Sequence, residues 1–268
     1  MYGKHDCDRY GCLFEKNKKR KGKYHGRGRI LKGMEMSEFL LEARGLSKFY
    51  GYKPALKDLN LNLEKGKIIG LLGPNGSGKS TFIKLCNDIL QPSEGEILIG
   101  GYPVGVETKK LVSYLPERTY LDNTMTPAEY IRYFSDFYED FDGKKAYDML
   151  GSLKINSKDK LKTMSKGTKE KVQLILVMSR QAKLYMLDEP IGGVDPAARD
   201  YILNTIISNY NPDASVIIST HLITDIEQVL DEAIFIQDGE LKLHKTVDEI
   251  RSIEGKSVDA LFREVFRC

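Results

Sequence analysis

A glycine-rich segment at residues 73–81 sets the strongest limit on how this sequence can fold. It follows the apolar run 68–72, precedes a segment with helical periodicity, and reads Gly73-Pro74-Asn75-Gly76-Ser77-Gly78-Lys79-Ser80-Thr81. Glycines at this spacing let successive backbone N–H groups converge on phosphate oxygens, because no Cβ atom stands in the way. We expect Lys79 to add a positive charge, Ser80 to offer its hydroxyl group to Mg²⁺, and the following helix to direct its N-terminus at the same phosphates. The pattern predicts a phosphate-binding loop.

Charge is divided unevenly along the chain. Residues 1–33 contain 11 Lys or Arg and 3 Asp or Glu, a net charge of +8, whereas the whole sequence of 268 residues carries +3 and the remainder therefore −5. A basic, aperiodic segment cannot bury apolar surface. We therefore expect residues 1–36 to be a disordered extension outside the fold, or alternatively an arm that binds nucleic acid or anionic lipid. Residues 37–268 are expected to form the folded domain.

Hydrophobic composition indicates a chain without membrane spans. The sequence is 41% hydrophobic, enough for one substantial core or two lobes. It has no apolar run of the roughly 18–20 residues needed to cross a bilayer. Its four cysteines have no framework spacing, so we expect reduced thiols in a cytoplasmic protein.

Strand and helix patterns alternate from residue 39 onward. Segments 40–46, 56–63 and 96–99 alternate apolar and polar residues, as half-buried antiparallel strands do. Short apolar segments, as expected of buried parallel strands, lie at 68–72, 184–187 and 216–219. Helical patterns lie at 80–89, 126–138, 167–179 and 196–209. Ser165 is placed to cap the third helix, and Asp195 followed by proline is placed to start the fourth. The sequence predicts an α/β core with an antiparallel β subdomain and an inserted helical subdomain at about 119–180.

Two consecutive carboxylates follow a second apolar strand. Asp188 and Glu189 end the strand at 184–187, far along the chain from Lys79. An aspartate at a strand end near a phosphate-binding loop is suited to organise Mg²⁺. The neighbouring glutamate is then placed to take a proton from the water that attacks the γ-phosphate. Together with the loop, this pair predicts hydrolysis of a nucleoside triphosphate.

These motifs, together with Met164-Ser165-Lys166-Gly167-Thr168, resemble the nucleotide-binding subunits of ABC (ATP-binding cassette) transporters over roughly residues 40–245. The resemblance implies a P-loop NTPase core of the RecA-like type. It also implies that Ser165 and the Gly167 N–H contact the γ-phosphate of ATP held by the opposite subunit. The usual family sequence here is Leu-Ser-Gly-Gly-Gln, so Lys166 replaces the first glycine and Thr168 replaces the glutamine.

The resemblance also assigns four residues by position. Tyr50 is similar to the aromatic residue that stacks on adenine, and Asp195 to the key residue of the loop that meets the facing subunit. His221 ends a buried strand and corresponds to a γ-phosphate contact. Glu117 stands where most relatives carry a glutamine that contacts Mg²⁺. Either the metal neutralises this additional carboxylate, or Glu117 contacts it differently.

The activity implied by the resemblance is ATP hydrolysis, with ATP and Mg²⁺ bound between two subunits, either a homodimer or a pair with a paralogous ATPase. A separate integral-membrane permease, docked near Glu117 and the aromatic residues of segment 130–141, would place the subunit at the cytoplasmic face of the membrane. The short helical subdomain and the short tail favour the multidrug and bacitracin-type exporters, with a drug, a peptide or a lipid-like substrate, over importers. The alternatives are a soluble ATPase that acts on nucleic acid or ribosomes, which only the basic segment supports, and a regulator that binds nucleotide without hydrolysing it, which Glu189 and His221 argue against.

Overall fold

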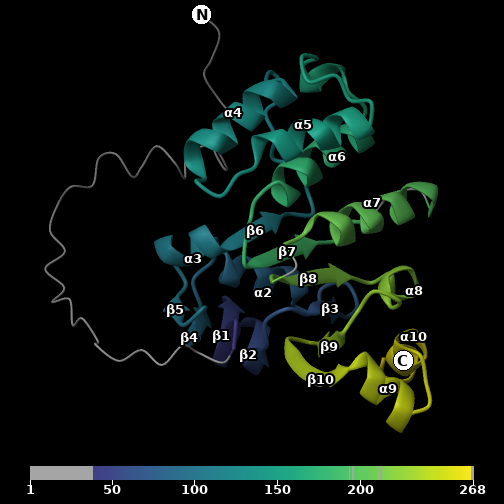
Figure 1. Ribbon diagram of the computed structural model, residues 1–268. Helices are drawn as coiled ribbons and strands as arrows, with labels where there is room; N and C mark the ends of the chain where they lie inside the picture. The colour runs from purple at the N-terminus through teal and green to yellow at the C-terminus, as the bar shows by residue number, and fades with distance from the viewer. Residues whose placement is uncertain (1–38, 193, 195, 212, 267–268) are drawn as a thin grey trace, which may run out of the picture. The chain divides into compact units, whose positions relative to one another are not determined.

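The computed structural model describes residues 39–266 except 193, 195 and 212. The basic segment 1–36 and Asp195 lie outside the described residues, so the predictions made for them are not addressed by the structure. Two β-sheets and a set of helices make up the described part of the chain (Figure 1). The predicted combination of an α/β core, an antiparallel sheet and a group of helices is confirmed.

The larger sheet has six strands in the order β10-β9-β3-β8-β7-β6. Five strands are parallel: β3 (Ile68–Leu72), β6 (Val112–Leu115), β7 (Leu184–Asp188), β8 (Ser215–Thr220) and β9 (Glu232–Gln237). The edge strand β10 (Glu240–Thr246) pairs antiparallel with β9. Because β3, β8, β7 and β6 are neighbours and run in the same direction, the segments after their carboxyl ends gather along one edge of the sheet.

The smaller sheet has four antiparallel strands in the order β2-β1-β4-β5. They are β1 (Leu41–Tyr50), β2 (Lys53–Leu63), β4 (Glu94–Ile99) and β5 (Tyr102–Pro103). The burial of β2 alternates along most of its length, with Leu59, Leu61 and Leu63 buried and the residues between them exposed. One face of this strand therefore packs on the core, as its sequence predicts.

The helices of the core are α2 (Lys79–Cys86), α3 (Val106–Leu111), α7 (Pro196–Asn209), α8 (Ile223–Ile226), α9 (Val247–Ile253) and α10 (Val258–Val265). Between residues 119 and 180 the elements are α4 (Pro127–Phe137), α5 (Gly143–Ser152), the 3₁₀ turn η2 (Leu161–Thr163) and α6 (Lys166–Met178). Helices α4, α5 and α6 pack against one another (Figure 1). No helix of the described residues is long and apolar enough to cross a membrane.

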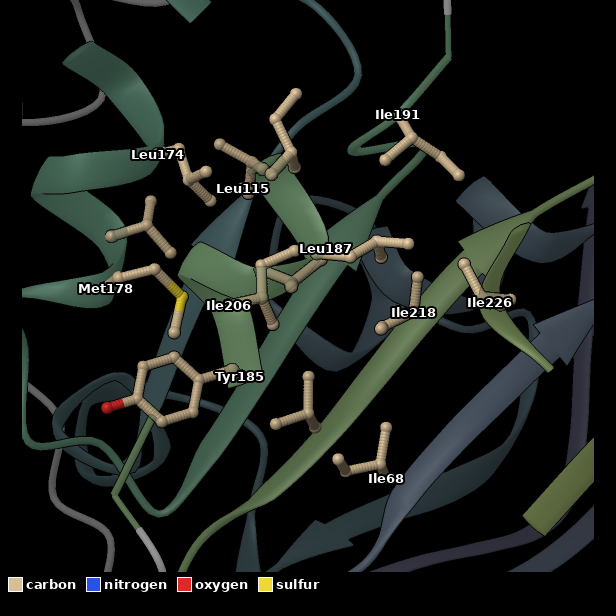
Figure 2. Packing of buried hydrophobic residues seen from close by; sticks show 14 of the residues in the cluster. Ile68, Leu115, Leu174, Met178, Tyr185, Leu187, Ile191, Ile206, Ile218 and Ile226 are labelled. Atoms are coloured by element: carbon tan, nitrogen blue, oxygen red, sulfur yellow. The ribbon is translucent and has the colours of Figure 1, made fainter. Parts of the chain in front are cut away.

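Residues on the two faces of the parallel strands enter two different hydrophobic clusters. On β7, Tyr185 and Leu187 pack in one cluster with residues of α6 and α7. Leu184 and Met186 pack in the other cluster, with residues of α2 and the antiparallel sheet. Figure 2 shows Tyr185 and Leu187 among helix residues such as Met178. The parallel sheet is thus covered on both faces, which explains why its strands read as continuous apolar runs.

Arg180 joins the helical region to the sheet just after α6 ends. Its guanidinium group is buried and donates to the backbone carbonyls of Val112, Lys109 and Lys110, at 2.6, 3.3 and 3.1 Å, and to both carboxylate oxygens of Asp140. Its cation also lies 3.9 Å from the centre of the Tyr138 ring. A planar cation with five donors suits this set of acceptors. The contacts fix the end of α6 against the beginning of β6.

Candidate nucleotide-binding site

The glycine-rich segment forms the turn between β3 and α2. A Cβ atom at Gly73 would lie 2.3 Å from the Ile236 carbonyl oxygen, and one at Gly78 would lie 2.6 Å from the Ala55 carbonyl oxygen. Gly78 also has a φ of 116°, which L side chains rarely adopt. Both positions therefore require glycine. The loop begins directly after β3, as the sequence predicts, and α2 begins at Lys79, one residue before the start of the predicted helix.

Lys79 begins α2 with its side chain folded along the loop. The side chain is 5% exposed, and its Nζ donates to the carbonyl oxygens of Gly73 at 2.7 Å and Pro74 at 3.1 Å. Burial lowers the pKa of Lys79, and the negative charges of Glu189, Asp188 and Glu117 act in the opposite direction. The loop thus holds a cation in a poorly solvated place, where an additional anion would be attracted strongly.

Asp188 lies at the carboxyl end of β7 and is 1% exposed. Its Oδ1 atom accepts hydrogen bonds from Ser80 Oγ at 3.0 Å and from Ser219 Oγ at 2.6 Å. The structure therefore brings together the serine and the aspartate that the sequence assigned to Mg²⁺. Hydroxyl and carboxylate oxygens are the ligands that this cation prefers.

Glu189 has a left-handed backbone with a φ of 51°. Its N–H donates to the carbonyl oxygen of Ser219 at 3.0 Å and to the hydroxyl of Ser219 at 3.1 Å, and these two bonds hold the unusual conformation. His221 Nδ1 lies 3.2 Å from both carboxylate oxygens of Glu189. The carboxylate thus has a histidine partner and lies 3.9 Å from Lys79 Nζ.

An open cavity of about 910 Å³ is lined by Lys79, Ser80, Glu189 and His221. Its lining includes loop residues 75–81, the segment 117–119, Glu189 and His221, together with Lys166, Lys169 and Glu170 from the first turns of α6. Ser77 also contributes to the lining, and its buried Oγ atom has no hydrogen-bond partner within the described part of the chain. A buried hydroxyl without a partner is unfavourable unless a bound group supplies one.

Apart from Gly73, Pro74 and Asp188, three described residues predicted for the site lie outside this lining. Tyr50 is 52% exposed, and the Lys48 Nζ lies 5.7 Å from the centre of its ring. Ser165 is exposed at the N-cap of α6, and its Oγ accepts from the Thr168 N–H at 3.2 Å. Gly167 is exposed, and a Cβ atom there would meet nothing within 4 Å. Their proposed roles therefore depend on groups that come from outside this chain or on bound nucleotide.

Sequence reasoning overlooked Ser219 as a member of the site. Its hydroxyl contacts both Asp188 and the Glu189 N–H, and its side chain is fully buried. The available signal was a hydroxyl residue at the end of an otherwise apolar strand, directly before Thr220 and His221. Polar residues that are buried at strand ends usually have a defined hydrogen-bond partner.

Comparison with known proteins identifies the family to which this arrangement belongs. The family model described as ABC transporter matches residues 56–192, which is more than half of the chain. The chain belongs to the ABC transporter family. Among curated relatives in Bacillus subtilis (strain 168), the linearmycin resistance ATP-binding protein LnrL is 32% identical over 75% of this chain and 68% of its own length. The SkfA peptide export ATP-binding protein SkfE is also 32% identical, over 75% of this chain and 87% of its own length.

Solved structures agree with this family assignment. A structure described as the ATP-binding subunit of an ABC transporter has a TM-score of 0.77 and 29% identity, and it covers 85% of this chain and all of its own. A dimeric ATP-binding cassette in a post-hydrolysis state, bound to ADP and Pi, has a TM-score of 0.67 at 21% identity, over 77% of this chain and 98% of its own, which supports the fold. The chain is thus an ATP-binding subunit of an ABC transporter, with the P-loop NTPase fold of that family, and it is an ATPase.

Proposed function

We propose that this ABC ATPase drives an exporter of drug, peptide or lipid-like substrates, working as a dimer at the cytoplasmic face of a membrane through a separate permease. The similarity to LnrL, named for resistance to linearmycin, and to SkfE, named for peptide export, supports the direction of transport. The observation that carries the ATP-driven part is the cavity formed by the phosphate-binding loop, Glu189 and His221. We assign this function to residues 37–268, with a helical subdomain at about 119–180.

ATP binds with its phosphates along residues 73–81. The unpartnered Ser77 hydroxyl and the backbone N–H groups of the loop are donors that suit phosphate oxygens. Lys79 already uses its ammonium group on two carbonyl oxygens, and the group has three hydrogens, so one remains for a phosphate. The phosphate also supplies a negative charge that offsets the burial of this cation.

Mg²⁺ fits the oxygen donors at the end of β7. Ser80 and Asp188 would hold the ion together with phosphate oxygens, and Glu117, which lines the same cavity, would complete the set. No group of three or more His, Cys, Asp or Glu residues within the described ranges is arranged to hold a metal by itself. This agrees with an ion that arrives with the nucleotide and neutralises the developing phosphate charge.

Glu189 acts as the general base in hydrolysis. Its carboxylate faces the cavity and is 12% exposed, so it can accept the proton of a water molecule that attacks the γ-phosphate. His221 contacts both carboxylate oxygens and also lines the cavity, so it orients the base and adds a contact to the γ-phosphate. The strained φ of Glu189 aims the carboxylate in this direction.

The second copy or a paralogous subunit supplies the opposite wall of the site. We assign Ser165 and the Gly167 N–H of that subunit to the γ-phosphate, Asp195 to the contact between subunits, and Tyr50 to stacking on adenine. Ser165, Gly167 and Tyr50 are exposed in this chain. Their exposure supports a role in contacts with a second subunit or with the nucleotide. Hydrolysis then removes the bridging phosphate and weakens the dimer.

The permease docks beside Glu117 and helix α4. Tyr133 and Phe137 are 38% and 53% exposed, and their ring centres lie 4.5 Å apart on one face of α4. Tyr130 and Phe134, by contrast, are buried in the core. Paired exposed aromatic rings suit an interface that is completed by another protein.

A Glu189→Gln variant tests the hydrolytic part of the proposal. We expect it to bind ATP with unchanged affinity, to lose steady-state hydrolysis, and to accumulate as an ATP-bound dimer in size-exclusion chromatography. The control is Glu264→Gln, which removes an exposed carboxylate that pairs with Lys256, and it should behave as the wild type. Wild-type turnover in Glu189→Gln would rule out the general-base role.

Affinity purification from detergent-solubilised membranes tests the transport part. We expect the tagged chain to retain an integral-membrane protein, and we expect Tyr133→Ser combined with Phe137→Ser to lose it while keeping ATP binding. Retention of nucleic acid instead, sensitive to salt and abolished by deletion of residues 1–33, would favour the alternative of an ATPase acting on nucleic acid or ribosomes.

A further inference from the structure

Gln173 is a buried polar side chain in the middle of helix α6. It is 2% exposed and has two hydrogen bonds to the segment that follows β6. Its Oε1 atom accepts from the Tyr120 N–H at 3.3 Å, and its Nε2 atom donates to the Pro116 carbonyl oxygen at 3.4 Å. The amide orientation is fixed by these partners, because a flipped amide would place donor against donor and acceptor against acceptor.

The two partners stand on either side of Glu117. Residues 117–119, between them, line the nucleotide cavity. Gln173 therefore holds both ends of the short segment that carries Glu117 to the cavity. We call residues 116–120 the Glu117 segment.

Helix α6 has contacts with the site and with the sheet at its two ends. Its first turns contribute Lys166, Lys169 and Glu170 to the cavity. Near its last turn, the Ser113 hydroxyl donates to the Val177 carbonyl oxygen at 2.8 Å, which fixes the helix to β6. Gln173 lies between these ends, so its amide group joins the helix that contributes to the cavity to the Glu117 segment.

We infer that Gln173 is a positioning residue that couples the Glu117 segment to helix α6 and so sets the place of Glu117 during ATP hydrolysis. The inference rests on the nucleotide site proposed above and does not depend on transport. Both hydrogen bonds are long, so each contributes at the lower end of the usual range. Their loss should reduce kcat by about fivefold and leave the KM for ATP within about twofold of wild type, because Gln173 itself does not line the cavity.

The test is a double-mutant cycle in the full chain. Gln173→Met keeps the side-chain volume and removes both hydrogen bonds, and Glu117→Ala removes the carboxylate that Gln173 positions. If Gln173 acts through Glu117, the combined variant should have the kcat of Glu117→Ala alone, within about twofold. Ser113→Ala is the matched control, because it removes a different hydrogen bond of α6, the buried one to β6, and leaves the Glu117 segment untouched. It should lower the thermal stability by a similar amount and keep the wild-type kcat.

A wild-type kcat in Gln173→Met, or equal losses of kcat in Gln173→Met and Ser113→Ala, would overturn the coupling. The coupling would also be overturned if the fold-loss of kcat in the combined variant equalled the product of the fold-losses in Gln173→Met and Glu117→Ala. A wild-type kcat in Glu117→Ala would instead refute the assignment of Glu117 to the site. If Gln173→Met fails to fold, Gln173→Glu replaces it in the cycle, since it keeps the shape and the acceptor for the Tyr120 N–H but, when ionised, cannot donate to Pro116.

Discussion

Replacement of Gly167 by alanine should separate stability from activity. Gly167 lies in the first turn of α6 and is exposed, and an added Cβ would meet nothing within 4 Å beyond its chain neighbours and the backbone of its own helix. An alanine in a helix is favoured over glycine by roughly 0.5–1 kcal/mol, because it restricts the unfolded chain. For a chain of this size the midpoint of thermal unfolding rises by about 2–4 °C per kcal/mol, so we expect an increase of roughly 1–4 °C.

Activity should move in the opposite direction. If the Gly167 N–H contacts the γ-phosphate in the opposite subunit, a methyl group there separates the helix from that phosphate. We expect kcat to fall by about tenfold or more, which corresponds to the loss of about 1.4 kcal/mol of transition-state stabilisation. ATP-dependent dimerisation in the Glu189→Gln background should weaken as well, as measured by size-exclusion chromatography.

Gly151 provides the matched control for this prediction. It lies in α5 and is exposed, and an added Cβ would likewise meet nothing within 4 Å beyond its chain neighbours and the backbone of its own helix. Gly151→Ala should raise the thermal midpoint by the same roughly 1–4 °C and leave kcat unchanged. Wild-type hydrolysis and dimerisation in Gly167→Ala would refute the assignment of this helix turn to the subunit interface. A lowered thermal midpoint in both variants would refute the reasoning about helix stability.

Three further predictions concern two buried cations, Lys79 and Arg180. Lys79→Ala should weaken ATP binding by roughly 10- to 100-fold in isothermal titration, because a charge-assisted contact is worth about 1.5–3 kcal/mol, and unchanged affinity would contradict the role of the loop. The pKa of Lys79 is lower in the folded than in the unfolded chain. Burial of the charged side chain therefore destabilises the folded state fully at any pH below the folded pKa, and this destabilisation is relieved as pH rises toward 10.5. The wild type should thus become more stable over that pH range. In thermal unfolding, Lys79→Met should show a smaller increase in stability with pH. Arg180→Ala should lower the free energy of unfolding by about 3–5 kcal/mol in urea, because it leaves the partly buried Asp140 carboxylate and three backbone carbonyl oxygens without their donor. Arg263→Ala, which removes a 73% exposed cation paired with Asp259, should change it by less than about 1 kcal/mol; equal effects would contradict the argument from burial.

The helices that were predicted correctly are specified by residues within them or directly beside them. Helix α7 spans 196–209 as predicted, and α6 begins directly after the Ser165 cap. The helix predicted at 80–89 ends earlier, at Cys86, where Asn87 and the left-handed Asp88 leave the helical conformation. Strand β6 was overlooked because it has only four residues, and its polar Ser113 is satisfied by Val177, a residue that is distant in the sequence. No local pattern of apolar residues could show that contact.

The candidate site depends on an order of strands that differs from the order along the chain. Strand β8 inserts between β3 and β7, which brings Ser219 opposite Asp188 in the parallel register. At that position Ser219 contacts two consecutive acidic residues. Its hydroxyl donates to the Asp188 carboxylate, and its hydroxyl and carbonyl oxygens accept from the Glu189 N–H. Asp188 is consequently buried beside Ser80, whereas Glu189, with its φ of 51°, faces the cavity and His221. The sequence motif shows that two carboxylates are adjacent. The division that we propose, into a metal-binding group and a base, agrees with the contacts of the neighbouring strand, because Ser219 bonds to the carboxylate of Asp188 but to the backbone N–H of Glu189.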